Sequence, residues 1–107
     1  MINILEIMSF IVDNRVANLP AKELSEVFDK LIWCMADNGE AINAVRKDWL
    51  NGDDIFKVEV AINMTETFPY STREEMTEKF DRIVKKWPNM KDLCDEIVKE
   101  WDEQFDS

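Results

Sequence analysis

The chain has 107 residues, a length at which one domain with a single buried core is the usual outcome, so we expect one domain over residues 1–107. Apolar residues make up 46% of it, with two glycines and three prolines, a composition that argues against both a disordered chain and a loop-rich β-sandwich. Twenty-three acidic residues against 13 basic ones leave a net charge of −10, which repels nucleic acid and anionic membranes and attracts basic surfaces. We therefore expect no direct binding to nucleic acid.

The cysteines and the N-terminus indicate the compartment. Cys34 and Cys94 are 60 residues apart, and each lies within an apolar helical pattern, which favours two buried, reduced thiols over a disulfide. No segment reaches the roughly 18 apolar residues of a membrane span. The apolar N-terminus lacks the basic flank and the small-residue cleavage site of a signal peptide. These features predict a cytoplasmic protein that does not engage a membrane.

Apolar spacing predicts a helix in each of the first three segments. Residues 2–16 carry apolar side chains on one helical face and beyond it, so this helix is expected to be buried on more than one side. Residues 21–37 form the clearest amphipathic pattern, which Asn38-Gly39 ends in a left-handed conformation. Residues 40–50 form a third, shorter helix. The expected inward positions are Ile4, Met8, Ile11, Val12, Leu24, Val27, Phe28, Leu31, Cys34, Met35, Ile42, Val45 and Trp49.

Residues 55–63 allow two interpretations. Their apolar residues alternate with polar or small ones, as in a strand, but a lone strand would leave its backbone edges unpaired. As a helix the segment would be apolar around most of its circumference, as in a helix buried in the middle of a bundle, and Asp53 or Asp54 could cap it. We favour the helix. A strand would instead make an edge-to-edge dimer the natural way to pair its backbone.

Two further helices are expected after residue 70. The sequence STREEM offers a capping box, either Ser71 with Glu74 or Thr72 with Glu75, and Pro88 separates the two helices. Their expected inward positions are Met76, Phe80, Ile83, Val84, Trp87, Leu93, Ile97, Trp101 and Phe105, with Cys94 and Val98 alongside. The whole pattern predicts an all-α fold, a compact bundle or helical-hairpin stack of five to six short helices, with 55–63 as the one possible β segment.

The residue types that usually carry chemistry are missing from the sequence. There is no histidine, which removes the commonest general base and the commonest metal ligand, and there is no glycine-rich phosphate loop. Two cysteines alone cannot form a structural zinc site. We therefore expect a protein that is not an enzyme, with no catalytic, cofactor-binding or metal site.

Trp33 is set apart from the apolar face of its helix. With Leu24 at the centre of that face, about 100° per residue puts Trp33 almost opposite, among charged side chains. A large aromatic residue there is a candidate anchor for a partner, since tryptophan is enriched among the residues that dominate binding energy. The alternative is that another helix of the same chain covers it.

The last helix carries acidic residues opposite its apolar row. These are Asp92, Asp95, Glu96, Glu100, Asp102, Glu103 and Asp106. They extend over roughly 21 Å, with about one carboxylate every 3 to 4 Å, which is close to the phosphate spacing of a nucleic-acid single strand. Such a stripe could occupy a basic groove made for nucleic acid; the alternative is a solvated face that keeps the protein soluble. Acids near a helix C-terminus cost stability, which favours a partner.

These patterns favour a small acidic binding protein that engages a basic, nucleic-acid-binding protein surface through those carboxylates and Trp33. In size, charge and helicity, though in no motif, the chain resembles the acidic anti-restriction and anti-CRISPR proteins of phages and mobile elements. The resemblance implies an inhibitor, acting in the host cytoplasm if it is phage-encoded. The alternatives are a helical adaptor or assembly protein, as a homodimer or not, and an immunity protein that neutralises a basic toxin. If the affinity for the partner falls steeply as salt concentration rises, an electrostatic interface is favoured over an apolar one.

Overall fold

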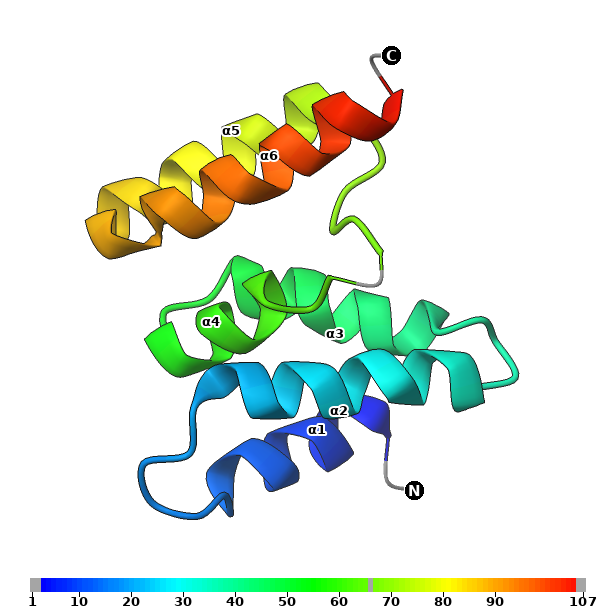
Figure 1. Cartoon of the computed structure of the whole chain (residues 1–107). Helices are drawn as coiled ribbons and strands as arrows, with labels where there is room; N and C mark the ends of the chain where they lie inside the picture. Colours follow the sequence, from blue (N-terminus) through cyan, green and yellow to red (C-terminus); the bar gives the residue numbers. More distant parts are fainter. Residues whose placement is uncertain (1–2, 66, 106–107) are drawn as a thin grey trace. The chain divides into compact units, whose positions relative to one another are not determined.

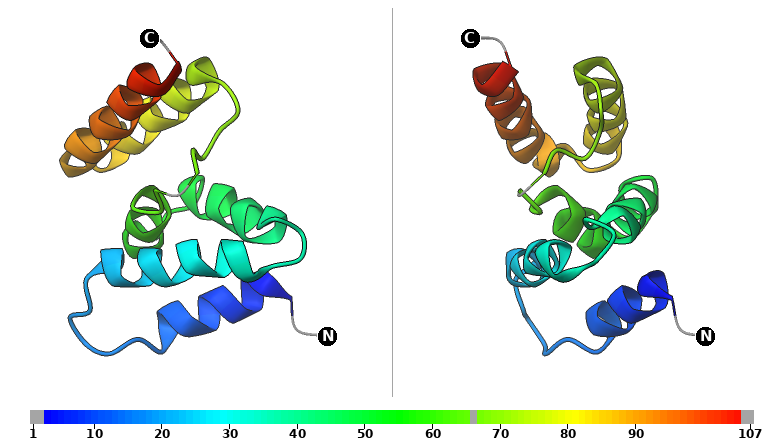
Figure 2. Two further views of the ribbon diagram at one scale, coloured as in Figure 1. Left: turned by 45° about the vertical axis from the view of Figure 1, so that its right-hand side comes forward. Right: turned by 90° about the vertical axis from the view of Figure 1, so that its right-hand side faces the viewer.

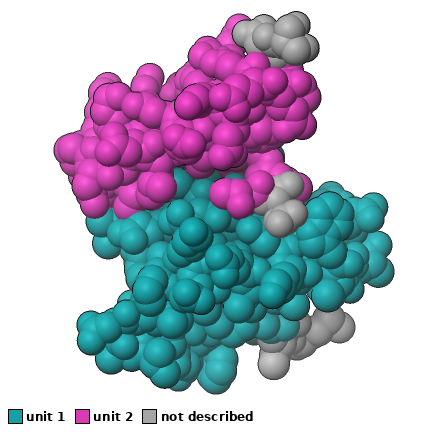
Figure 3. Space-filling view, viewed as in Figure 1, with its two compact units in different colours: residues 1–64 teal, residues 65–107 magenta. Residues whose placement is uncertain are grey.

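A computed structural model describes residues 3–65 and 67–105, and within them the chain is helical without strands (Figure 1). The helices are α1 (Ile4–Asp13), α2 (Ala21–Cys34), α3 (Glu40–Leu50), α4 (Ile55–Ile62), α5 (Arg73–Lys86) and α6 (Lys91–Phe105), with the 3₁₀ turn η1 (Pro88–Met90) before α6. The predicted all-α class with five to six short helices is confirmed. The chain divides into two compact units, residues 1–64 and residues 65–107 (Figure 3). The single domain expected over 1–107 stays a prediction.

The first unit is built around α4. This helix packs against both α2 and α3, while α1 packs on α3 (Figure 2). Within the core, the rings of Phe28 and Trp49 meet edge to face at 6.0 Å. The buried apolar residues of the unit are Met8, Val12, Ala21, Leu24, Phe28, Ile32, Ile42, Val45, Trp49, Leu50, Val58, Val60, Ala61, Ile62 and Met64.

Within the segment 55–63, residues Ile55–Ile62 form a helix, as we favoured, and Asn63 is its C-cap. The Asp54 carboxylate accepts hydrogen bonds from the backbone N–H groups of Phe56 and Lys57, so the expected cap is present. Val58 and Val60 are both fully buried although they are two positions apart, which places them about 200° apart around the helix. Burial on most sides therefore explains why the sequence alternates like a strand.

Side chains from α2 and α3 satisfy the C-terminal carbonyls of α4. The last carbonyls of a helix have no intrahelical donor. The Ser25 hydroxyl of α2 donates to the Val60 carbonyl at 2.7 Å. Arg46 of α3 is 1% exposed, and its guanidinium donates to the carbonyls of Ala61, at 2.8 Å, and Met64. A buried cation is thus placed where the helix dipole favours positive charge.

The inward face of α2 differs from the predicted one. Leu24 and Phe28 are buried as expected, but Val27 and Cys34 are exposed, and Ser25 and Ile32 point inward instead. The reason is the bond between Ser25 and α4, which turns a polar residue into the core and rotates the helix away from its purely apolar stripe. The expectation that both cysteines are buried is therefore wrong for Cys34.

The turn after α2 confirms the expected left-handed conformations. Asn38 has φ 61° and Gly39 has φ 79°. A Cβ atom on Gly39 would lie 2.5 Å from Cγ2 of Ile32, so glycine is required there for space as well as for conformation. The helix itself ends at Cys34, before the predicted boundary at residue 37.

Helix α1 is buried on one side only, contrary to the prediction. Met8 and Val12 are buried, whereas Ile7 is 42% and Phe10 66% exposed. The cause is that α1 packs mainly on α3, which covers one face. Its remaining apolar residues stay in contact with solvent.

The second unit is a helical hairpin formed by α5 and α6. The Thr72 hydroxyl accepts from the backbone N–H of Glu75 at 3.2 Å, so of the two expected caps the second is the one formed. After α5, Pro88 opens the turn η1. The buried apolar residues of the hairpin are Met76, Phe80, Ile83, Met90, Cys94 and Ile97.

The predicted core row of α6 is only partly correct. Ile97 is buried and Trp101 half-buried, but Leu93 is 36% and Phe105 58% exposed. Cys94 takes the inward position next to Ile97 because the hairpin partner α5 lies on that side. The Phe68 ring, from the segment before α5, packs on Trp101 with ring centres 4.8 Å apart.

No helix in the described part of the chain is both long and apolar enough to cross a membrane.

We expect Arg46→Met to lower the free energy of unfolding by about 3 kcal/mol, because it removes the buried donor of the Ala61 and Met64 carbonyls. Ser25→Ala removes one hydroxyl bond to the Val60 carbonyl and should cost about 1 kcal/mol. Urea unfolding followed by far-UV circular dichroism measures both changes.

Arg82→Met is the matched control, because Arg82 is exposed on α5. It should change the free energy of unfolding by less than about 0.5 kcal/mol. If Arg46→Met and Arg82→Met unfold at the same urea concentration, the buried guanidinium does not stabilise α4.

Candidate protein-binding surface

The outward face of α6 carries four carboxylates that no basic residue of the described chain neutralises by an ion pair. They are Asp92, Glu96, Glu100 and Glu103, and all four are exposed. Cys94 and Ile97 on the other side of α6 are buried in the hairpin. Because these buried residues fix the rotation of the helix, the carboxylates form an ordered array and not a flexible acidic tail. We call these four residues the acidic face.

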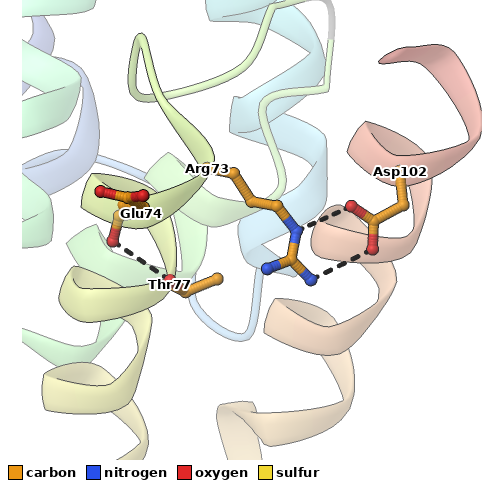
Figure 4. A network of polar contacts seen from close by, with 4 residues as sticks. All are labelled: Arg73, Glu74, Thr77 and Asp102. Carbon is orange, nitrogen blue, oxygen red and sulfur yellow. Dashed lines mark hydrogen bonds and ion pairs between the residues drawn. The ribbon is translucent and has the colours of Figure 1, made fainter. Parts of the chain in front are cut away.

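Two of the predicted acidic residues are held by bases within the same unit. The Lys91 ammonium lies 2.5 Å from a carboxylate oxygen of Asp95, one helical turn away. The Arg73 guanidinium, at the start of α5, binds both carboxylate oxygens of Asp102, with Nε at 2.7 Å and an outer nitrogen at 3.2 Å (Figure 4). This bidentate pair ties the N-terminal end of α5 to the C-terminal part of α6.

Each of the two pairs shifts the pKa of one of its members. The hydrogen bond from Arg73, together with its charge, lowers the pKa of Asp102 below the ordinary value. The hydrogen bond to Asp95 and its charge raise the pKa of Lys91. Asp102 and Lys91 therefore both remain charged at neutral pH. Asp106, the last of the predicted acidic residues, lies outside the described residues.

The pairing widens the spacing of the available carboxylates. Asp92 to Glu103 covers roughly 16 Å of helix, which leaves about 5 Å between neighbouring members of the acidic face. A nucleic-acid single strand has one phosphate per roughly 3.4 Å. The acidic face is thus sparser than the sequence suggested, and Lys99 lies within its length.

Trp33 is 70% exposed on α2 in the first unit, whereas the acidic face belongs to the second unit. No helix of its own unit covers it, so the alternative of an intramolecular cover is not met within residues 3–64. Val27, 45% exposed, and Cys34 are further exposed residues of α2. The first unit therefore carries exposed apolar side chains of its own, in addition to those of α1.

Sequence reasoning missed Arg73 as the partner of Asp102. The two residues are 29 positions apart, and no periodicity connects them. By contrast, Lys91 and Asp95 have the i, i+4 spacing of a helical ion pair and could have been paired from the sequence.

The described residues contain no candidate metal cluster, and one of the two thiols is buried. No group of three or more cysteine, aspartate or glutamate residues there is arranged to hold a metal ion. Burial raises the pKa of the Cys94 thiol to about 12, which suppresses the nucleophilic thiolate at neutral pH.

Comparison of the chain with protein-family models, with curated proteins and with solved structures found no match.

We expect Arg73→Gln to raise the pKa of Asp102 back toward its ordinary value, because the charged hydrogen bonds are lost. The sign follows from linkage: a carboxyl whose pKa is lowered in the folded state adds stability above its unfolded pKa, and this stability disappears as pH falls through the folded pKa. Carboxyl ¹³C shifts recorded by NMR from neutral to acidic pH give the titration directly.

Arg82→Gln provides the control, since it removes the same charge from α5 without touching Asp102. An Asp102 titration that is identical in Arg73→Gln and in the parent protein would contradict the bidentate pair.

Proposed function

We propose that this chain is a small acidic, non-enzymatic binding protein that engages the basic surface of another protein through the acidic face of α6. The observation that carries the proposal is the presence of four exposed, unneutralised carboxylates on one side of a helix whose other side is fixed in a hairpin. An ordered array loses less conformational entropy on binding than a flexible tail does.

The electrostatics of α6 support a charged partner. The helix has no basic residue in its last turn, where Glu103 opposes the helix dipole. Like charges at Asp92 and Glu96, and at Glu96 and Glu100, repel one another at i, i+4. The unfavourable dipole interaction and each like-charge pair lower the stability of the free protein by a few tenths of a kcal/mol. A basic partner surface would remove these costs on binding.

A nucleic-acid-binding protein is the partner class that the resemblance to phage inhibitors favours. A net charge of −10 directs the chain to basic surfaces, and a clustered basic surface is characteristic of nucleic-acid-binding proteins. With about 5 Å between carboxylates, the acidic face would present roughly two carboxylates for every three phosphates of a single strand. Inhibition would then follow from occupying the site.

We expect the triple variant Asp92→Lys, Glu96→Lys and Glu100→Lys to abolish capture of the partner from a host lysate. The parent protein should capture it at low ionic strength and release it at high ionic strength, because the Debye length falls from about 10 Å at 0.1 M to about 3 Å at 1 M. The captured protein is identified by mass spectrometry and its binding is then measured with purified components.

A triple reversal of the same size on the first unit, Asp13→Lys, Glu23→Lys and Glu40→Lys, serves as the control and should retain capture. Equal losses of partner capture in both triple variants would indicate a general effect of net charge. Capture that survives the charge reversal on α6 would exclude the acidic face as the binding surface.

A homodimer or adaptor function has its own support in the exposed apolar side chains of the first unit. Trp33 and Phe10 are 70% and 66% exposed, which is unusual for residues of their size. In this case association would tolerate salt, because it would depend on apolar area.

For the apolar interface we expect Trp33→Ala to weaken association about 30-fold, the effect of a loss near 2 kcal/mol, without changing the unfolding midpoint. Sedimentation velocity over a concentration series, in reducing buffer, measures self-association. Leu93→Ala, an exposed apolar position in the other unit, is the control. A parent protein that stays monomeric at every concentration excludes the homodimer.

A further inference from the structure

A groove runs between α5 and α6 on one side of the hairpin. Its volume is about 740 Å³, and every residue that lines it belongs to the second unit. Its floor is apolar and consists of Phe80, Val84, Cys94 and Val98. Phe80 and Cys94 are buried beneath it, while Val84 and Val98 are half-buried.

The groove is open because two packed helices bury only the side chains that face each other. Ile83 and Ile97 are buried in the hairpin, 4% and 7% exposed. Val84 and Val98 follow each of them by one residue, about 100° further around the helix, and α5 and α6 supply nothing to cover them. A third helix laid along the groove would complete a bundle and bury both valines.

The rim of the groove determines the charge of its occupant. Its charged residues are Asp81, Asp95, Asp102, Glu103, Lys91 and Lys99. Lys91 pairs with Asp95, and Arg73 from outside the groove pairs with Asp102, so Asp81 and Glu103 remain against Lys99, an excess of one carboxylate. Glu103 also belongs to the acidic face, so the rim continues into that face. The lining extends along α6 from Lys91 to Glu103, roughly 18 Å, the length of about 12 helical residues.

We propose that this groove binds a basic amphipathic helix of the partner protein, with the apolar face of that helix on Val84 and Val98 and its basic side chains on the acidic rim. The inference rests on the proposed function and specifies the partner's binding element. A second copy of this chain is a poor occupant, because two molecules of charge −10 repel each other. Helix-in-groove binding of this kind is a recurrent mode of recognition.

The test uses a synthetic peptide of about 18 residues, with leucine at i, i+3, i+4 and i+7 and lysine at most other positions, a length that covers the groove. A second peptide of the same composition has its leucines spread around the helix. Titration of the full chain, followed by calorimetry and by the methyl NMR signals of Val84 and Val98, should show saturable one-to-one binding of the first peptide and at least about 10-fold weaker binding of the second.

Val98→Lys places a positive charge in the floor of the groove, where it repels the lysines of the first peptide. Binding of that peptide should weaken at least about 10-fold. The double variant Val84→Ala, Val98→Ala removes apolar contacts without adding charge and should also weaken binding, with helical content checked by circular dichroism. Leu93→Lys is the matched control, because Leu93 is exposed on α6 but does not line the groove, and it should bind as the parent does.

The proposed binding of a basic helix in the groove is contradicted if the chain binds the two peptides with equal affinity. It is also contradicted if the Val98→Lys and Leu93→Lys variants bind the first peptide with equal affinity. In that outcome the proposed function still stands if the triple variant of the acidic face loses capture. Conversely, peptide binding that depends on Val98, with capture unaffected by the acidic-face variant, assigns binding to the groove and excludes the acidic face.

Discussion

The buried guanidinium of Arg46 is the interaction on which the first unit depends. Helix α4 has eight residues, too few to be stable alone in water. It is held at its start by the Asp54 carboxylate, and at its end by Arg46 and by the Ser25 hydroxyl. Since α2 and α3 both pack on α4, these polar contacts fix the positions of all three helices at once. Burying a cation in the core is favourable here because carbonyl oxygens at a helix C-terminus receive it.

The second unit follows a different principle. Its hairpin is held by apolar contacts on one side of each helix and by the bidentate pair of Arg73 and Asp102 across the helix ends. The apolar contacts leave a half-exposed groove, and the same rotation of α6 turns the acidic face outward. The two proposed binding features are thus consequences of one packing arrangement, which explains why they adjoin at Glu103.

Sequence reasoning recovered the parts of the fold that local chemistry encodes. Helix boundaries follow from caps such as Asp54 and Thr72, and the apolar inward residues of α3 follow from their spacing, because neither requires knowledge of a distant partner. Sequence reasoning failed where the orientation or pairing of a side chain depends on a residue far away in the sequence. Ser25 points inward for a carbonyl 35 positions away, and Asp102 is paired with a base 29 positions away, so neither could be found by periodicity. The candidate site was predicted as a location on α6, but its effective charge was not.

The different exposure of the two thiols has a practical consequence. Cys94 is buried with its pKa raised to about 12, whereas Cys34 is exposed at the end of α2. Alkylating reagents and fluorescent maleimides should therefore label the native protein at one position without any engineered cysteine. By the same reasoning, air oxidation joins two molecules through Cys34 in preference to closing a loop within one chain. A covalent dimer of this origin would report on storage conditions and not on recognition.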